Sequence, residues 1–183
     1  MKGFKILLNF KECDKYMLER KGCYDYRAVR YRATADKLFE QGLNNNDTIC
    51  DVGAGWTEFD YCLRKEYDWR GRYLPIDAGM TKTDLNDWEP DRNYDYFVAL
   101  EILEHLYEPE NFLTTILKKV NKGIVISVPN PETTDVFSMD KTHVSLPDKQ
   151  LFQKNGFIVE ETEFFGGFYS QDKPGSLFAY YFK

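Results

Sequence analysis

Short apolar runs alternate with amphipathic segments along most of this chain. Residues 123–129, GIVISVP, form a nearly continuous apolar run rich in β-branched side chains, which is typical of a strand buried on both faces. The segment before it, 109–120, has apolar residues at helical spacing and a proline at its first position. Such an alternation predicts a mostly parallel sheet with helices packed on both faces.

The same pattern assigns the remaining elements. Strands are expected at 47–52, 71–77, 81–85, 94–100, 123–129, 157–165 and 176–183, and helices at 26–41, 57–67, 109–120 and 146–154, the last capped by Ser145. The last two strands have no helix between them, and a parallel return needs a crossover of a dozen or more residues. We therefore expect a doubly wound, mostly parallel seven-stranded α/β sheet with an antiparallel C-terminal hairpin strand.

Composition limits the classes of protein that fit. We expect one domain over all 183 residues, with 1–25 as an N-terminal arm. The net charge of −6 disfavours electrostatic binding to bulk nucleic acid. The four cysteines have no CxxC spacing, and Cys50 lies in an apolar strand, as a buried thiol would. No secretory signal or membrane-spanning run is recognisable, so we expect a cytoplasmic protein with reduced thiols.

A glycine turn, DVGAG, follows the first expected strand. Ligands of open parallel sheets bind outside the carboxyl ends of the strands. Gly53 and Gly55 would let the backbone approach a ligand closely, and the helix from Thr57 would direct free N–H groups to the same place. An ordinary tight turn between a strand and a helix is an equally simple interpretation.

Acidic residues follow the next two expected strands. Asp77 ends 71–77, where a carboxylate can accept both hydroxyls of a ribose, and Asp84 ends 81–85 beside Leu85. An acidic lining suits a ligand with positive charge and disfavours a pyrophosphate. The third glycine of the dinucleotide fingerprint, G-x-G-x-x-G, is absent after Gly53 and Gly55, which argues against a nicotinamide oxidoreductase.

In this order, the segments resemble class I S-adenosylmethionine (SAM)-dependent methyltransferases. DVGAG resembles the first motif of that family, and ALEILEHL, at 99–106, resembles the segment after the fourth strand in members with an E-x-L-E-H pattern. The resemblance covers about 40–165 and the closing hairpin. It implies a Rossmann-like fold and SAM as cofactor, bound by Asp51, Gly53, Ala54, Gly55, Asp77, Asp84, Leu85 and Leu100. No large insertion follows the fifth strand, so a lid would come from 131–144 and the N-terminal arm.

A stripe of polar residues follows strand 94–100. If residues 101–108 are helical, Glu101, Glu104, His105 and Glu108 share one face, and Ile102, Leu103 and Leu106 share the other. His105 and His143 are candidate general bases, because imidazole titrates near neutral pH. We expect Glu101, Glu104, His105 and His143 to converge on the methyl acceptor, with Glu101, His105 and His143 in catalytic roles.

Other interpretations of these residues stay open. The same four residues match metal ligands of methyltransferases that modify the 3′ ends of small RNAs, but the string also occurs in metal-free relatives, and we expect no bound metal. A solvated helix face is a further alternative. Arg27, Arg30 and Arg32 would either close over the cofactor, meet an anionic substrate or, as we favour, lie on a solvated helix face.

The sequence thus favours a SAM-dependent methyltransferase that acts on an oxygen or nitrogen of a small-molecule acceptor. The alternatives are a metal-assisted RNA 2′-O-methyltransferase and a SAM-binding module without catalysis.

Overall fold

The described chain forms one mixed sheet. The computed structural model describes residues 18–19, 21–22, 24–163 and 175–183. Six strands lie in the order β2-β1-β3-β4-β6-β5. They are β1 (Thr48–Val52), β2 (Arg72–Ile76), β3 (Tyr94–Leu100), β4 (Val120–Pro129), β5 (Ile158–Thr162) and β6 (Ser176–Phe182). Strand β6 pairs antiparallel with β4 and β5, and the other pairings are parallel. The predicted reversed C-terminal strand is therefore confirmed.

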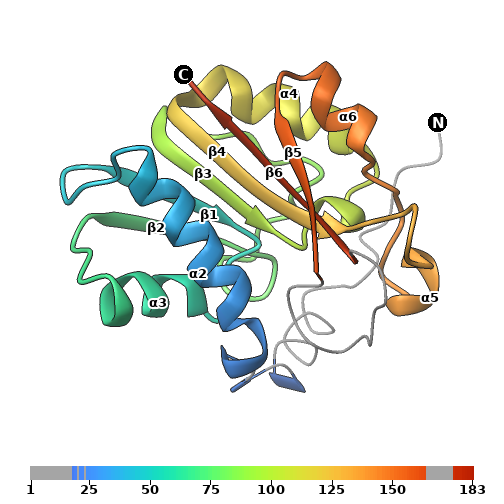
Figure 1. The fold of residues 1–183 in the computed structure, drawn as a ribbon, viewed down its shortest axis with the longest axis horizontal. Coiled ribbons are helices and arrows are strands. Elements are labelled where there is room, and N and C mark those ends of the chain that lie inside the picture. The colour runs from blue at the N-terminus through green and yellow to red at the C-terminus, as the bar shows by residue number, and fades with distance from the viewer. Residues whose placement is uncertain (1–17, 20, 23, 164–174) are drawn as a thin grey trace.

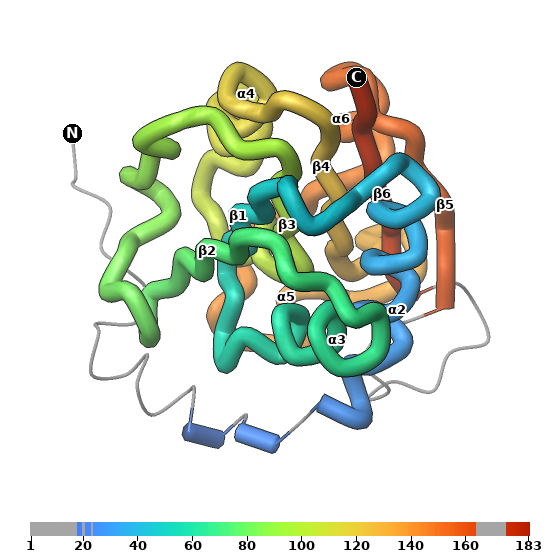
Figure 2. The backbone as a smooth tube through the Cα atoms, turned by 90° about the vertical axis from the view of Figure 1, so that its left-hand side faces the viewer, coloured from blue at the N-terminus to red at the C-terminus, as the bar shows by residue number. Residues whose placement is uncertain are grey.

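Helices cover both faces of this sheet. They are α2 (Tyr24–Glu40), α3 (Glu58–Glu66), α4 (Pro109–Lys119), α5 (Val136–Met139) and α6 (Lys149–Lys154), with a short 3-10 turn, η1 (Leu103–His105). Helices α2 and α3 lie on one face, and α4 and α6 lie on the other (Figure 1). Figure 2 shows the same layers from the side, with α3 and α4 on opposite sides of the strands. The predicted doubly wound arrangement is confirmed.

Alternate residues of the central strands fill two separate cores. On β3, Tyr96 and Val98 pack into the cluster under α2 and α3, whereas Phe97 and Ala99 pack into the cluster under α4 and α6. All four are fully buried, as expected for a strand covered on both sides. Cys50 is a buried free thiol, as predicted.

The expected strand at 81–85 is not formed, so the sheet has six strands and the prediction of seven was wrong. The backbone N–H groups of Thr81 and Thr83 donate to the Asp77 carbonyl, at 2.9 and 3.3 Å. Lys82 has a φ of 56°, in the left-handed region that no strand accommodates. The backbone groups that a strand would offer to a neighbour are therefore used within local turns.

The expected helix over 101–108 is also wrong. Glu101 leaves β3 with a φ of 57°, and only the three residues Leu103–His105 form a 3-10 turn. Glu104 is 1% exposed, beside the fully buried Leu103. Acidic and apolar side chains are therefore buried together, and no polar stripe exists.

Two smaller expectations concern helix capping and the N-terminal arm. The cap of α6 is Asp148, whose side chain accepts from the Leu151 N–H, whereas the predicted cap, Ser145, donates to the Leu103 carbonyl at 2.9 Å. Ser145 instead ties the loop after α5 to η1. Most of the expected arm, 1–25, lies outside the described residues. Within the described part of the chain, no helix combines the length and apolarity that a bilayer crossing requires.

Candidate functional site

The glycine turn lies between β1 and α3. Gly53 and Gly55 have φ angles of 76° and 51°, and the N–H groups of Gly53 and Ala54 donate to the Ile76 carbonyl at 2.7 and 3.3 Å. A Cβ atom on Gly53 would lie 2.0 Å from the Ile102 side chain, whereas one on Gly55 would meet no atom within 4 Å. The turn is thus packed against the 101–105 segment at one glycine and open at the other.

Asp77 lies directly beside this turn. One carboxylate oxygen, Oδ2, accepts from the Gly55 N–H at 3.1 Å. The other, Oδ1, accepts from the N–H groups of Gly79 and Met80 at 2.7 and 3.1 Å. Backbone donors therefore hold the carboxylate at the end of β2, next to the open side of the glycine turn.

Asp51 is the buried acid of the site. It is 4% exposed and accepts a hydrogen bond from the Tyr73 hydroxyl. Burial raises the pKa of the Asp51 carboxyl to about 7, because a carboxylate loses hydration there. The hydrogen bond from Tyr73 lowers this pKa, and the charge of Asp77 raises it further. The predicted binding residues of the turn therefore include an acid that titrates near neutral pH.

The structure does not place Asp84 at a strand end. Its Oδ1 atom accepts from both the backbone N–H and the side-chain amide of Asn86, at 3.0 Å each, and so belongs to a local turn. Leu85 packs partly against the core, and Leu100 is 8% exposed at the end of β3.

Glu101 is held by two other elements. The Ser127 hydroxyl of β4 donates to its Oε1 atom at 2.8 Å, and Arg30 Nη1 of α2 lies 3.8 Å from the same oxygen. Burial raises the pKa of the Glu101 carboxyl, and the Arg30 charge opposes that rise. Arg30 is only 6% exposed, so the expectation of a solvated helix face was wrong for this arginine.

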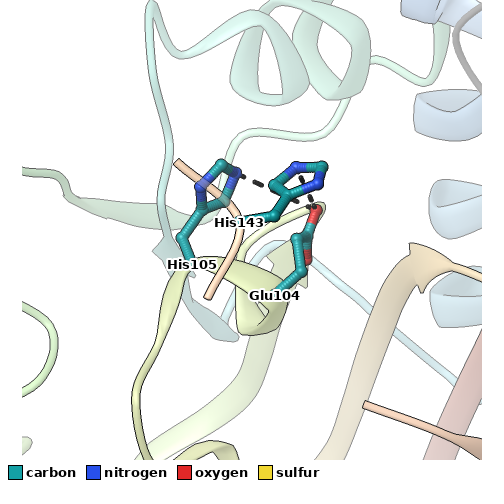
Figure 3. A group of neighbouring side chains, drawn as sticks. All are labelled: Glu104, His105 and His143. Atoms are coloured by element: carbon teal, nitrogen blue, oxygen red, sulfur yellow. Dashed lines mark ion pairs between the residues drawn. The ribbon is translucent and has the colours of Figure 1, made fainter. Parts of the chain in front are cut away.

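Glu104, His105 and His143 form a compact cluster (Figure 3). The Nε2 atom of each imidazole lies 3.9 Å from Glu104 Oε1, and the ring centroids are 4.7 Å apart. Glu104 Oε2 is buried without a hydrogen-bond partner, and burial, together with the charge of Glu101, raises the pKa of the carboxyl well above its usual range. One ligand atom from each residue lies within 4.8 Å of the others, a spacing that one cation can bridge.

Three of the four expected residues thus meet, whereas Glu101, near enough to influence Glu104, has Ser127 and Arg30 as its direct partners. Comparison with known proteins identifies structures that share this fold. No protein-family model and no curated sequence matches the chain. Solved structures do match it. A SAM-dependent methyltransferase from Archaeoglobus fulgidus superposes with a TM-score of 0.63 at 18% identity, over 92% of this chain and 99% of that one.

The chain has the class I methyltransferase fold. Two further structures agree. A chain from the complex between the Haloferax volcanii Trm112 methyltransferase activator and its methyltransferase gives a TM-score of 0.65 at 14% identity, over 96% of both chains. The plantazolicin methyltransferase BpumL, in complex with S-adenosylhomocysteine (SAH), gives 0.64 at 13% identity, over 94% of this chain and 89% of that one.

Several residues at this end of the methyltransferase fold escaped the sequence analysis. They are Tyr73, Ser127, Asp140 and Thr142. Ser127 carried a signal, since it is a polar residue inside an apolar strand. Thr142 carried none, because its partner, His105, is remote in sequence and is brought close only by the fold.

Proposed function

We propose that this protein is a SAM-dependent methyltransferase. The observation that carries the proposal is the open glycine turn with Asp77 beside it, at the carboxyl end of β1 in a methyltransferase fold. Ligands of doubly wound sheets bind at this edge. Space over Gly55 admits a ligand, and the neighbouring N–H groups of α3 can bind its carboxylate.

The residues present fit SAM. Asp77 would accept the ribose hydroxyls, and Asp51, Gly53, Ala54 and Gly55 would surround the amino-acid end. Asp84 and Leu85 would contact the adenine, and Leu100, at the end of β3, would line the cofactor pocket. When bound, the cofactor supplies an activated methyl group on a sulfonium, whose positive charge suits the buried acids Asp51 and Glu101.

We further propose that the acceptor is an oxygen or nitrogen of a small molecule. His105 is the better placed base, because 25% of its side chain is exposed, against 6% for His143. Glu101 and His143 would shape the electrostatics around it. Methyltransferases for plantazolicin, coclaurine and magnesium protoporphyrin IX share the fold, and the net charge of −6 disfavours binding to bulk nucleic acid.

The test is a screen for methyl transfer. Purified protein is incubated with SAM and a panel of small phenols, carboxylic acids and amines, and SAH and methylated products are quantified by mass spectrometry. We expect one chemical class to be methylated in the presence of a chelator, and His105→Asn to reduce the rate by roughly 100-fold or more. SAH binding without turnover on any acceptor would instead favour the non-catalytic SAM-binding module.

A second candidate is metal-assisted methylation of an RNA 2′-hydroxyl. The 4.8 Å cluster of Glu104, His105 and His143 is the observation that favours it. Its test is elemental analysis of protein purified without chelator, followed by methylation of a short RNA with and without Mn²⁺. Stoichiometric metal with Mn²⁺-dependent methylation of the RNA end would replace the small-molecule proposal.

A further inference from the structure

The position of the proton on His105 follows from its neighbours. The Thr142 hydroxyl donates to Asp140 Oδ1 at 2.7 Å, and the Thr142 backbone N–H donates to the same oxygen at 2.9 Å. His105 Nδ1 lies 3.0 Å from the Thr142 hydroxyl oxygen. Because the single hydroxyl proton is already directed to Asp140, this oxygen can only accept from Nδ1.

A second contact also indicates that Nδ1 of His105 carries the hydrogen. The Thr142 carbonyl oxygen lies 3.3 Å from His105 Nδ1, and a carbonyl can only accept. Both Thr142 oxygens therefore accept from Nδ1, so Nδ1 carries the hydrogen and Nε2 keeps its lone pair. Thr142 is 5% exposed, which shields these hydrogen bonds from competing water.

His105 differs from its neighbour in accessibility. His143 Nδ1 lies 2.6 Å from the Val136 carbonyl, so it too carries the hydrogen on Nδ1, but only 6% of its side chain is exposed. His105, at 25%, is the imidazole of the cluster that an incoming molecule can reach. Figure 3 shows the two rings together beside Glu104.

We propose that Asp140 and Thr142 are positioning residues that hold His105 in the Nδ1–H tautomer, with the Nε2 lone pair presented to the methyl acceptor. The catalytic consequence rests on the proposed function. SAM, when bound, would supply the methyl group to the acceptor oxygen or nitrogen and leave as neutral SAH. The acceptor proton passes to Nε2, and the imidazolium then releases it to water.

Nuclear magnetic resonance tests the tautomer without cofactor or acceptor. The chain has two histidines, so long-range ¹H–¹⁵N spectra of labelled protein at about pH 8.5 contain two imidazoles, and His105→Asn assigns them. We expect the hydrogen of His105 on Nδ1. In Asp140→Ala the freed Thr142 hydroxyl can donate to Nδ1, so the His105 signals should shift toward the Nε2–H tautomer.

Variants of Thr142 complete the test. Thr142→Val should move the two His105 nitrogen signals toward each other, because the tautomers then exchange, and Thr142→Ser should restore them. Thr133→Val is the matched control, since it makes the same change at a threonine before α5 whose N–H and hydroxyl both donate to the Asn130 carbonyl. Unshifted backbone amide signals of strands β1 and β2, far from this loop in the sequence, report that each variant is folded.

Two outcomes would overturn the proposal. One is a wild-type His105 with its hydrogen on Nε2. The other is a set of His105 signals that neither Asp140→Ala nor Thr142→Val changes in folded protein. Failure to find methyl transfer leaves this test intact, so the two proposals fail separately. With an acceptor in hand, Thr142→Val should lower kcat by roughly tenfold or more at unchanged KM, and Thr142→Ser should restore it.

Discussion

Buried carboxyl groups gather at one end of the sheet, where each side chain has been taken out of water. Burial raises the pKa values of Asp51, Glu101 and Glu104, and Arg30 is the cation that opposes the rise at Glu101. A folded protein retains such costly groups mainly at functional sites. A positively charged ligand such as a sulfonium would offset part of their desolvation.

Asp51 gives the stability of the protein a specific pH dependence. Its pKa is about 7 in the folded protein, against about 3.9 for an unfolded chain. Between these values the folded state holds a proton that the unfolded state has released, so the contribution of Asp51 to stability falls as pH rises toward 7 and is constant above it. Asp51→Asn cannot ionise but still accepts from Tyr73. From about pH 5 to 8 its free energy of unfolding should rise relative to wild type, by about 2.5 kcal/mol.

Urea unfolding of the wild type and of Asp51→Asn at about pH 5 and about pH 8 measures this difference in free energy of unfolding. Groups that do not interact with Asp51 titrate alike in the two proteins, so their contributions cancel. A difference that is flat with pH would show that Asp51 is already ionised when folded.

Asp77 is tested through ligand affinity. Hydrogen bonds to a charged group contribute about 1.5–3 kcal/mol. Asp77→Ala should therefore weaken SAH binding by roughly 10- to 150-fold in calorimetry. Asp87→Ala, at an exposed acid of the same loop region, is the control and should bind as wild type does. Equal affinity of a folded Asp77→Ala protein would remove Asp77 from the pocket.

At the scale of elements, the glycine turn and the 101–105 segment act as one unit. A Cβ atom on Gly53 would collide with Ile102, whereas one on Gly42, at a similar φ of 84°, would meet no atom within 4 Å. Gly53→Ala should lower the free energy of unfolding by about 2–4 kcal/mol, and Gly42→Ala by only about 1 kcal/mol. Adding Ile102→Ala to Gly53→Ala should recover part of the loss, and a double-mutant cycle measures that coupling. Strictly additive losses would mean that the two segments are independent.

The sequence predicted elements well where one local pattern decides them. Strand 94–100 and helix 109–120 needed only periodicity and a proline, and both formed within a residue of the expected bounds. The segment after β3 failed because a left-handed Glu101 redirects the chain, and its helical spacing then has no meaning. The strand at 81–85 failed because Asp77 and Lys82 impose turns that compete with pairing.

The residues of the candidate site divide in the same way, into those that the order of the strands predicts and those that it does not. Asp77 lies beside the glycine turn because the ends of parallel neighbours β1 and β2 must meet, which topology alone implies. Arg30, Asp140 and Thr142 depend on side-chain contacts across the sheet edge and within a loop. No periodicity encodes such contacts.

At the scale of the whole molecule, one fold brings together residues from Asp51 to His143 near the carboxyl ends of four neighbouring strands, β2, β1, β3 and β4. That edge is where a doubly wound sheet binds its ligand. The central claim is that the ligand is the adenosyl cofactor of methyl transfer.

Thermal unfolding with and without ligand tests this claim most directly. With SAH at about 100 times its dissociation constant, we expect a stabilisation of about 2.7 kcal/mol, seen as a rise in Tm of roughly 5–10 °C. NAD at the same concentration should leave Tm unchanged, because Glu58 stands where a dinucleotide fingerprint has the third glycine that makes room for a pyrophosphate. A rise in Tm with NAD and none with SAH or SAM would contradict the claim.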